Sequence, residues 1–234
     1  MKAMVLQSPE TLVQGEIENP TIEAGNTLIK ITHSGVCGTD LKIYQGGIPV
    51  DYPRIMGHEM IGEVAEVGDA EGVEIGSRVI IDPVVYCGHC YQCQRGQTQL
   101  CPTGAIYGRD RDGGFTEYMQ TAADAIFPLP DNISGNTAPL LQVMTTCLHA
   151  QRLSDIFPGD SVVVLGLGVG GLLHVQLAKA RGAYPVIGIT RSPQRRELAE
   201  QLGADFTFAP DDDVDKKVLE LTNGVGADLV IESV

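Results

Sequence analysis

Four cysteines gather in one short stretch of the chain, and their spacing is typical of a metal site. They form a C-x2-C-x2-C-x7-C run made of Cys87, Cys90, Cys93 and Cys101. Four thiolates fill the tetrahedral shell of a structural zinc ion and leave no position for substrate. The pattern therefore predicts a zinc ion that holds the fold together and takes no part in catalysis.

The same stretch has an alternative interpretation as a redox-active C-x-x-C motif at Cys87 and Cys90. Such a motif needs one exposed dithiol at the N-terminus of a helix. The two additional cysteines, with Pro83 and Gly96 nearby, argue against it. His89 is a further possible donor, but four sulfurs already complete the zinc shell, so we expect His89 to be a loop residue.

A second set of possible ligands is spread along the chain. Cys37 lies in the segment GVCGTD, and His58 and Glu59 lie in the segment GHEMIG. Alone, a cysteine is usually a small buried hydrophobe and a histidine a structural residue. Together, Cys37 and His58 supply two of the three protein ligands of a catalytic zinc, whose fourth position stays open for substrate.

The second half of the chain carries a dinucleotide signature. An apolar strand, Ser161–Leu165, is followed by Gly166, Gly168 and Gly171 in the pattern G-x-G-x-x-G, and then by an apolar helix expected over Leu172–Arg181. The glycines allow a tight turn, close approach to a pyrophosphate, and helix–strand packing. A loop without a ligand is the alternative, but the position between strand and helix favours a dinucleotide on the helix N-terminus.

The elements around these residues divide the chain into two domains. Up to about Asn136 the sequence is dense in glycine and proline with short β runs such as Thr27–Ile31, which indicates a compact β domain. Beyond it, strand, glycine turn and helix alternate, as in βαβ units on a parallel sheet. We expect domains over 1–150 and 151–234, joined by a helix that ends before Phe157.

Three more strands are expected in the second domain, at Pro185–Ile189, Phe206–Phe208 and Asp228–Glu232, with a polar helix over Asp211–Thr222. With Ser161–Leu165 they make four strands. A full dinucleotide fold has six. We therefore expect the second domain to be incomplete in this chain.

The GVCGTD and GHE segments, the four-cysteine stretch and the segment VVVLGLGVGG resemble, in order and spacing, the zinc-containing medium-chain dehydrogenase/reductase family over Met1 to Val234. The resemblance implies an α/β protein in which a GroES-like β-barrel catalytic domain precedes a doubly wound Rossmann domain. It implies a zinc-dependent oxidoreductase that transfers hydride between an alcohol or polyol and NAD(P), working as a dimer or tetramer. It also implies that the family's C-terminal segment, which returns to the catalytic domain, is missing.

The resemblance assigns roles to individual residues. Cys37 and His58 match the first two catalytic-zinc ligands, Glu59 the acidic neighbour that can swing onto the metal, and Thr39 the hydroxyl that takes the substrate proton. Two zinc ions per chain follow, and the catalytic one would act as a Lewis acid on the alcohol. Thr39 has an alternative role as a helix N-cap, and Asp40 either orients His58 or caps the same helix.

Two positions depart from the family pattern. Lys42 stands where many members have the histidine that ends the proton relay, so the relay ends differently or passes through water. Gln142 stands at the third zinc ligand, and its amide oxygen is a weaker donor than a thiolate or carboxylate. Gln142, Glu59 and a water therefore remain alternatives for that position. Cys147, on another face of the same helix, is expected in the core.

The residues that follow the expected strand Pro185–Ile189 indicate whether NAD or NADP is preferred. NAD enzymes place Asp or Glu there to bind the ribose 2′-hydroxyl. This chain has Thr190 and Arg191, with Arg195 and Arg196 close behind and no acid. A 2′-phosphate would meet a hydroxyl and a guanidinium rather than a carboxylate, so we expect NADP to be favoured over NAD. The alternative for Arg195 and Arg196 is an exposed basic helix start.

Composition excludes several other classes. The 234 residues are 43% hydrophobic, which is enough for two apolar cores. The net charge of −14 argues against a basic surface that binds nucleic acid or an anionic membrane. No signal peptide and no run of about 18 apolar residues is present, so a cytoplasmic protein is expected.

Three hypotheses remain: the dehydrogenase, a zinc-stabilised dinucleotide-binding protein without turnover, and a thiol-redox module. Threonine, polyols, sugars and simple secondary alcohols all remain possible substrates.

Overall fold

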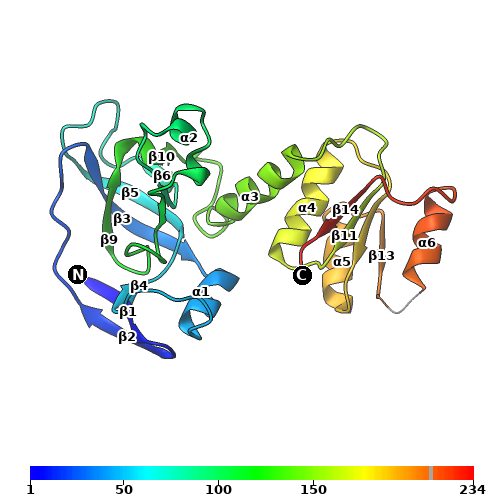
Figure 1. Ribbon diagram of the computed structural model, residues 1–234, viewed down its shortest axis with the longest axis horizontal. Helices are drawn as coiled ribbons and strands as arrows, with labels where there is room; N and C mark the ends of the chain where they lie inside the picture. Colours follow the sequence, from blue (N-terminus) through cyan, green and yellow to red (C-terminus); the bar gives the residue numbers. More distant parts are fainter. Residues whose placement is uncertain (211–212) are drawn as a thin grey trace. The chain divides into compact units, whose positions relative to one another are not determined.

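The chain forms two compact units, Met1–Gln142 and Val143–Val234. The computed structural model describes residues 1–210 and 213–234. The division falls inside helix α3 (Leu140–Arg152), the helix that was expected to connect the domains. Figure 1 shows antiparallel strands in the first unit and a parallel sheet flanked by helices in the second.

The first unit is built on an antiparallel five-stranded sheet in the order β10-β6-β5-β3-β9. Ile29 on β3 and Met60 and Val64 on β5 are fully buried and form its apolar core with residues of the neighbouring strands. The bounds of its strands are β3 (Asn26–Gly35), β5 (Glu59–Val67), β6 (Arg78–Ile81), β9 (Tyr118–Ala122) and β10 (Ile126–Pro128).

Two small sheets and short helices complete this unit. One sheet has the order β2-β1-β4 and the other pairs β7 with β8. The bounds are β1 (Lys2–Ser8), β2 (Thr11–Glu16), β4 (Arg54–Ile55), β7 (Val84–Val85), β8 (Ala105–Ile106), α1 (Gly38–Tyr44), α2 (Tyr91–Gln94) and the 3-10 turns η1 (Thr98–Leu100) and η2 (Ala123–Ala125).

The pairing of β3 with β5 positions the dispersed ligands. The register places Gly35, the last residue of β3, opposite Glu59, the first residue of β5. Cys37 follows β3 by two residues, and His58 immediately precedes β5. Because the end of one strand lies against the start of its antiparallel partner, residues far apart in sequence meet at one edge of the sheet.

The second unit is a parallel sheet in the order β13-β12-β11-β14. This is the order 3-2-1-4 of the first four strands of a dinucleotide-binding sheet. β12 is buried along its whole length, as expected for a parallel strand covered on both faces. The bounds are β11 (Val162–Leu165), β12 (Val186–Ile189), β13 (Phe206–Phe208), β14 (Leu229–Glu232), α4 (Val169–Ala180), α5 (Pro193–Gln201) and α6 (Val214–Leu221).

Helix boundaries differ from the expected ones. α4 begins at Val169 instead of Leu172, because Gly168 serves as the N-cap and the second half of the glycine motif is already helical. Gly171 therefore lies within the helix. The polar helix expected from Asp211 is α6, which begins at Val214, and its expected first residue lies outside the described part of the chain.

The later part of α3 is bonded to α4 within the second unit. The side-chain Nε2 of Gln151 donates to Nδ1 of His174 at 3.1 Å and to its carbonyl oxygen at 3.0 Å. Arg181 donates to the Gln151 carbonyl oxygen at 2.7 Å. Burial lowers the pKa of His174, which favours the neutral ring that accepts the amide. Cys147, 5% exposed, is buried as expected.

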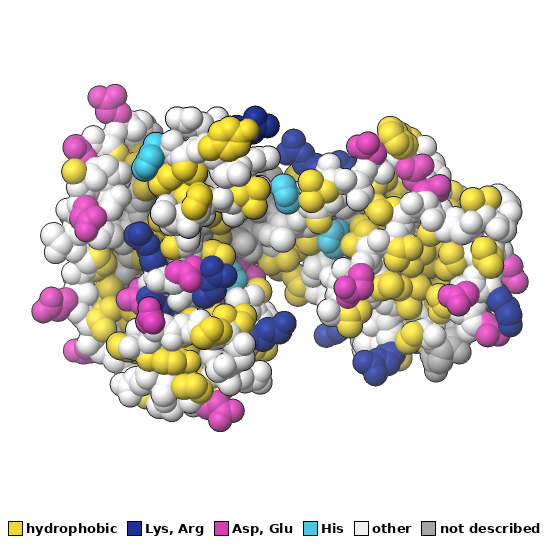
Figure 2. All heavy atoms as spheres, viewed as in Figure 1, with side chains coloured by type: hydrophobic (Ala, Val, Ile, Leu, Met, Phe, Trp, Pro, Cys, Tyr) yellow, Lys and Arg dark blue, Asp and Glu magenta, His cyan; other side chains and the backbone are white. Residues whose placement is uncertain are grey.

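Acidic side chains are spread over the surface. The sequence holds 30 Asp and Glu residues against 16 Lys and Arg residues, and Figure 2 shows carboxylates on both units on the face in view. Within residues 1–210 and 213–234, no helix is long and apolar enough to span a bilayer.

Candidate metal centres and dinucleotide site

The four-cysteine stretch folds into a compact donor cluster. The Sγ atoms of Cys90 and Cys93 lie 3.4 Å apart and those of Cys87 and Cys93 4.0 Å apart, and all four sulfurs lie within 4.8 Å of one another. Zinc–sulfur bonds of about 2.3 Å in a tetrahedron place sulfurs about 3.8 Å apart. The four thiols therefore fit a zinc ion.

Backbone amides surround these sulfurs. The Cys90 N–H points to Cys87 Sγ at 3.4 Å, and the Cys87 N–H points to Cys101 Sγ at 3.5 Å. The Thr103 hydroxyl lowers the pKa of Cys101 to about 6, whereas desolvation raises that of Cys93 to about 12. A dication at the centre would favour the thiolate at every position. His89 is exposed, with Nδ1 2.7 Å from the Cys87 carbonyl oxygen.

The dispersed residues also meet. The ligand atoms of Cys37, His58 and Glu59 lie within 4.8 Å of one another. A thiolate, an imidazole and a carboxylate are the donor types that zinc binds in proteins. The cluster thus offers three protein ligands at the edge where β3 ends and β5 begins, which leaves a fourth position for another molecule.

Asp40 holds this cluster together. Its Oδ2 accepts from the Cys37 N–H at 2.8 Å, and its Oδ1 accepts from the Gly57 N–H at 3.3 Å and lies 3.4 Å from His58 Nδ1. Asp40 is 2% exposed. It therefore combines the two roles considered for it, orienting His58 and closing the first turn of α1.

Cys37, not Thr39, is the N-cap of α1. The cap expected at Thr39 was wrong because Asp40 reaches back to the Cys37 N–H as in a capping box, so the helix begins one residue after the cysteine. Thr39 lies inside the helix, and after His58, the largest cause, its N–H and hydroxyl also lower the pKa of the Cys37 thiol.

The charges in the cluster are strongly coupled. Hydrogen bonding to Asp40, followed by hydrogen bonding to Cys37, raises the pKa of His58 to about 10. The His58 side chain in turn lowers the pKa of Cys37. Burial raises the pKa of Glu59. The geometry therefore favours an ion pair between the thiol and the imidazole, and a bound cation would replace the shared proton.

Gly35 makes room for Glu59. A Cβ atom at Gly35 would lie 1.9 Å from Glu59 Oε2. No side chain other than hydrogen allows the carboxylate to stand where it does. This role was missed at the sequence level. A glycine inside a strand is a general signal of close approach, but its partner becomes visible only in the register of β3 and β5.

The remaining residues of the expected catalytic set lie on helices. Lys42 is exposed on α1, three residues after Thr39 and thus on the same side of the helix. Gln142 lies in the first turn of α3. With Glu59 the cluster brings three charged or imidazole donors together, so Glu59 is one of the alternatives considered for the third ligand.

The glycine motif forms a cradle at the end of β11. Gly166 has φ +87°, a conformation that favours glycine, and a Cβ at Gly171 would lie 1.8 Å from the Gly166 carbonyl oxygen. No side chain caps Gly168, and a Cβ there would meet nothing within 4 Å. The space beside Gly168, at the N-terminus of α4, is therefore open, which is compatible with a pyrophosphate there.

Thr190 follows β12 directly, and its N–H donates to the Phe208 carbonyl oxygen at 3.1 Å. Arg196 donates to the carbonyl oxygens of Thr190 and Arg191 at 2.8 and 3.1 Å, so its guanidinium fixes the turn. Arg191 and Arg195 are exposed. The guanidinium groups of Arg191 and Arg195 are therefore accessible to solvent near Thr190.

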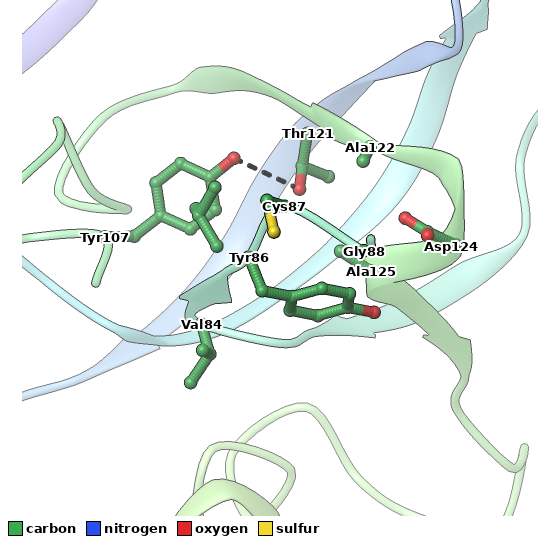
Figure 3. Close-up of a pocket in the computed structure, with 10 residues that line it drawn as sticks. Val84, Tyr86, Cys87, Gly88, Tyr107, Thr121, Ala122, Asp124 and Ala125 are labelled. Atoms are coloured by element: carbon green, nitrogen blue, oxygen red, sulfur yellow. Dashed lines mark hydrogen bonds between the residues drawn. The ribbon is translucent and has the colours of Figure 1, made fainter. Parts of the chain in front are cut away.

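The cysteine lobe, the segment from Cys87 to Cys101, adjoins a pocket of about 200 Å³ at Cys87, and Figure 3 shows the residues that line this pocket. Tyr107 donates to Thr121 Oγ1 at 3.3 Å on one side, and Tyr86 and Asp124 lie on the other. Its lining includes Cys87 but none of the three donors of the dispersed cluster. It is therefore separate from the candidate catalytic centre.

Two family models match the chain. The model of the alcohol dehydrogenase GroES-like domain matches residues 23–131, and that of the zinc-binding dehydrogenase matches residues 168–234. L-threonine 3-dehydrogenase of Pyrococcus furiosus is 40% identical over 223 residues, which cover 93% of this chain and 64% of that protein.

Solved structures agree. A putative zinc-binding dehydrogenase from Sinorhizobium meliloti, bound to NADP, has a TM-score of 0.91 and 36% identity, over 99% of this chain and 69% of that one. A short chain alcohol dehydrogenase from Escherichia coli, complexed with NADH, has a TM-score of 0.91 and 34% identity, over 100% and 69%. The chain belongs to the zinc-containing medium-chain dehydrogenase/reductase family. It spans about two thirds of the length of these relatives.

Membership of the medium-chain dehydrogenase/reductase family confirms the fold class expected from the sequence. The GroES-like match lies within the first unit and the zinc-binding dehydrogenase match within the second. Zinc and a nicotinamide cofactor are the groups this family uses. The two donor clusters and the glycine cradle are where this medium-chain dehydrogenase offers the matching chemistry.

The two cysteine sites should respond differently to substitution. Cys93→Ser removes one of the four ligands of the closed zinc site, so it should lower the free energy of unfolding by at least about 2 kcal/mol. Cys37→Ser should instead abolish turnover and leave the melting temperature nearly unchanged. Thermal unfolding and steady-state rates of both variants measure this, and the reverse pattern would show that the two roles are exchanged.

Gly35→Ala should weaken zinc at the Cys37 cluster, because the new methyl group occupies the position of the Glu59 carboxylate. Displacing a group that positions or supplies a ligand costs about ten- to a hundredfold in metal affinity. Competition with a chelator, followed by zinc analysis, measures the loss. Gly38→Ala is the matched control, since a Cβ at Gly38 meets nothing within 4 Å; equal losses in both variants would refute the role of Gly35.

Proposed function

We propose that the protein is a zinc-dependent dehydrogenase that transfers hydride between an alcohol or polyol and NAD(P). The observation that carries this proposal is the cluster of Cys37, His58 and Glu59, whose donor atoms lie within 4.8 Å of one another and would fill three of the four positions of a tetrahedral zinc ion. A closed structural site has no free fourth position. The glycine cradle at the end of β11 supports the cofactor part of the proposal. A small-molecule substrate and a cytoplasmic homo-oligomer belong to the same proposal.

The residues of and around the cluster would bind the metal, orient its ligands and accept the substrate proton. Cys37, His58 and Glu59 hold the metal, and Asp40 keeps the imidazole and the Cys37 backbone in place. Zinc bound there supplies a Lewis acid that makes a nearby alcohol more acidic. Thr39, two residues after Cys37, supplies a hydroxyl that would accept the substrate proton.

Lys42 follows Thr39 by three residues and is exposed. A proton that leaves Thr39 would reach solvent along this side of α1, past Lys42, with a water as its last acceptor. Gln142 is left as an alternative ligand, while Glu59 supplies the charged donor. Relatives named threonine, sorbitol and alcohol dehydrogenase show that the substrate differs among similar proteins.

A dehydrogenase assay tests the proposal directly. The intact protein should reduce NAD(P) in the presence of a secondary alcohol, a polyol or threonine, and 1,10-phenanthroline should abolish the activity. Absorbance of the reduced nicotinamide follows the reaction. A protein that binds the reduced cofactor and zinc but turns over none of these substrates would favour a dinucleotide-binding protein without turnover.

Cofactor choice should depend on Thr190. A carboxylate at the end of β12 would accept from the ribose 2′-hydroxyl and repel a 2′-phosphate, so Thr190→Asp should shift preference from NADP to NAD. Hydrogen bonds to charged groups contribute about 1.5–3 kcal/mol, so a ten- to hundredfold change in the ratio of kcat/KM values is expected. Arg191→Ala should move the ratio in the same direction. A wild-type protein that already prefers NAD would contradict the assignment.

A further inference from the structure

The hydroxyl of Ser233 stands over the glycine cradle. Ser233 follows β14 directly, is half-buried, and donates its N–H to the Leu165 carbonyl oxygen at 2.8 Å. A Cβ placed on Gly170 would lie 3.1 Å from Ser233 Oγ, and one on Gly166 would lie 2.6 Å from the Ser233 carbonyl oxygen. In the described part of the chain, no hydrogen bond to this hydroxyl is formed.

The sheet order tells which part of a dinucleotide would face Ser233. β11 lies between β12, which ends at Thr190, and β14, which ends at Ser233. A dinucleotide binds across this switch point with its adenosine ribose toward the second strand. The other half must then extend toward β14. Ser233 therefore lies on the side of the switch point toward which the nicotinamide half of a bound dinucleotide would extend.

We propose that Ser233 is a cofactor-positioning residue whose hydroxyl donates a hydrogen bond to the phosphate on the nicotinamide side of the dinucleotide. This rests on the proposed function, because it requires a dinucleotide on the glycine cradle. The first-turn N–H groups of α4 approach the pyrophosphate from one side, and Ser233 adds a donor from β14. Because Gly170 lacks a side chain, the hydroxyl can approach the same oxygen as the helix N-terminus.

Ligand binding to the metal-loaded intact protein separates this role from a structural one. Ser233→Ala should raise the Kd of NADH and of ADP-ribose about tenfold, since one hydrogen bond to a charged group is lost. It should leave the Kd of AMP within about twofold, because AMP carries only the adenosine-side phosphate. Ser233→Thr keeps the hydroxyl and should restore tight binding. Ser154→Ala, another half-buried serine of the same unit, is the control.

A second variant tests the contact from its other side. Gly170→Ala places a methyl group against the hydroxyl and should weaken ADP-ribose binding in the wild-type background. In the Ser233→Ala background it should weaken binding much less, because the group it displaces is already gone. Additive losses would overturn the proposal.

The other outcomes of these binding measurements distinguish a failure of the role of Ser233 from a failure of the proposed function. An unchanged Kd for ADP-ribose in Ser233→Ala, or equal losses for AMP and ADP-ribose, would overturn the role of Ser233 and leave the proposed function standing. A lower melting temperature without a change in Kd would show that Ser233 only packs on the cradle. A wild-type protein that binds none of NADPH, NADH and ADP-ribose would refute the proposed function, and the role of Ser233 with it.

Discussion

The buried carboxylate of Asp40 is the interaction on which the candidate catalytic centre depends. Its two oxygens reach the Cys37 N–H, the Gly57 N–H and the His58 ring, which belong to the two segments that supply the metal donors. A carboxylate that is 2% exposed is costly unless all its bonds are made. The same contacts that satisfy Asp40 therefore also fix the distance between Cys37 and His58.

Glycines also position the functional groups, because at several points they let backbone and side-chain atoms approach closely. Gly35 leaves space for the Glu59 carboxylate, and Gly171 leaves space for the Gly166 carbonyl oxygen. A Cβ at Gly113 would lie 2.1 Å from the Gly57 carbonyl oxygen, so another loop packs directly beneath the segment that carries His58. Both candidate sites thus contain glycine positions where the packing leaves no room for a side chain.

Much of this arrangement follows from local sequence. The strands of the second unit are mostly apolar, with single exceptions at Gly188, Thr207 and Glu232, and β13 has the expected bounds of Phe206–Phe208. The cysteine lobe is equally local, since its four donors come from one short stretch. The start of α4 was misplaced because glycine weakens a helix in general, whereas here Gly170 and Gly171 begin one in order to pack on β11.

Contacts between segments that are distant in the sequence could not be predicted from local sequence patterns. Gly35 and Glu59 meet only because β3 and β5 pair in one register, and a shift by one residue would move every side chain to the other face. The orientation of His58 likewise depends on Asp40, on the helix that follows β3. Sequence patterns named the donors, while long-range pairing decides which of them meet.

The central claim is that the chain holds two zinc ions in chemically different sites, a closed one at the cysteine lobe and an open one at Cys37, His58 and Glu59. Elemental analysis combined with X-ray absorption at the zinc edge tests it most directly. Two zinc ions per chain, with an average of about 2.5 sulfur ligands each, are expected from four sulfurs at one site and one at the other. One zinc per chain with four sulfur ligands would contradict the open centre.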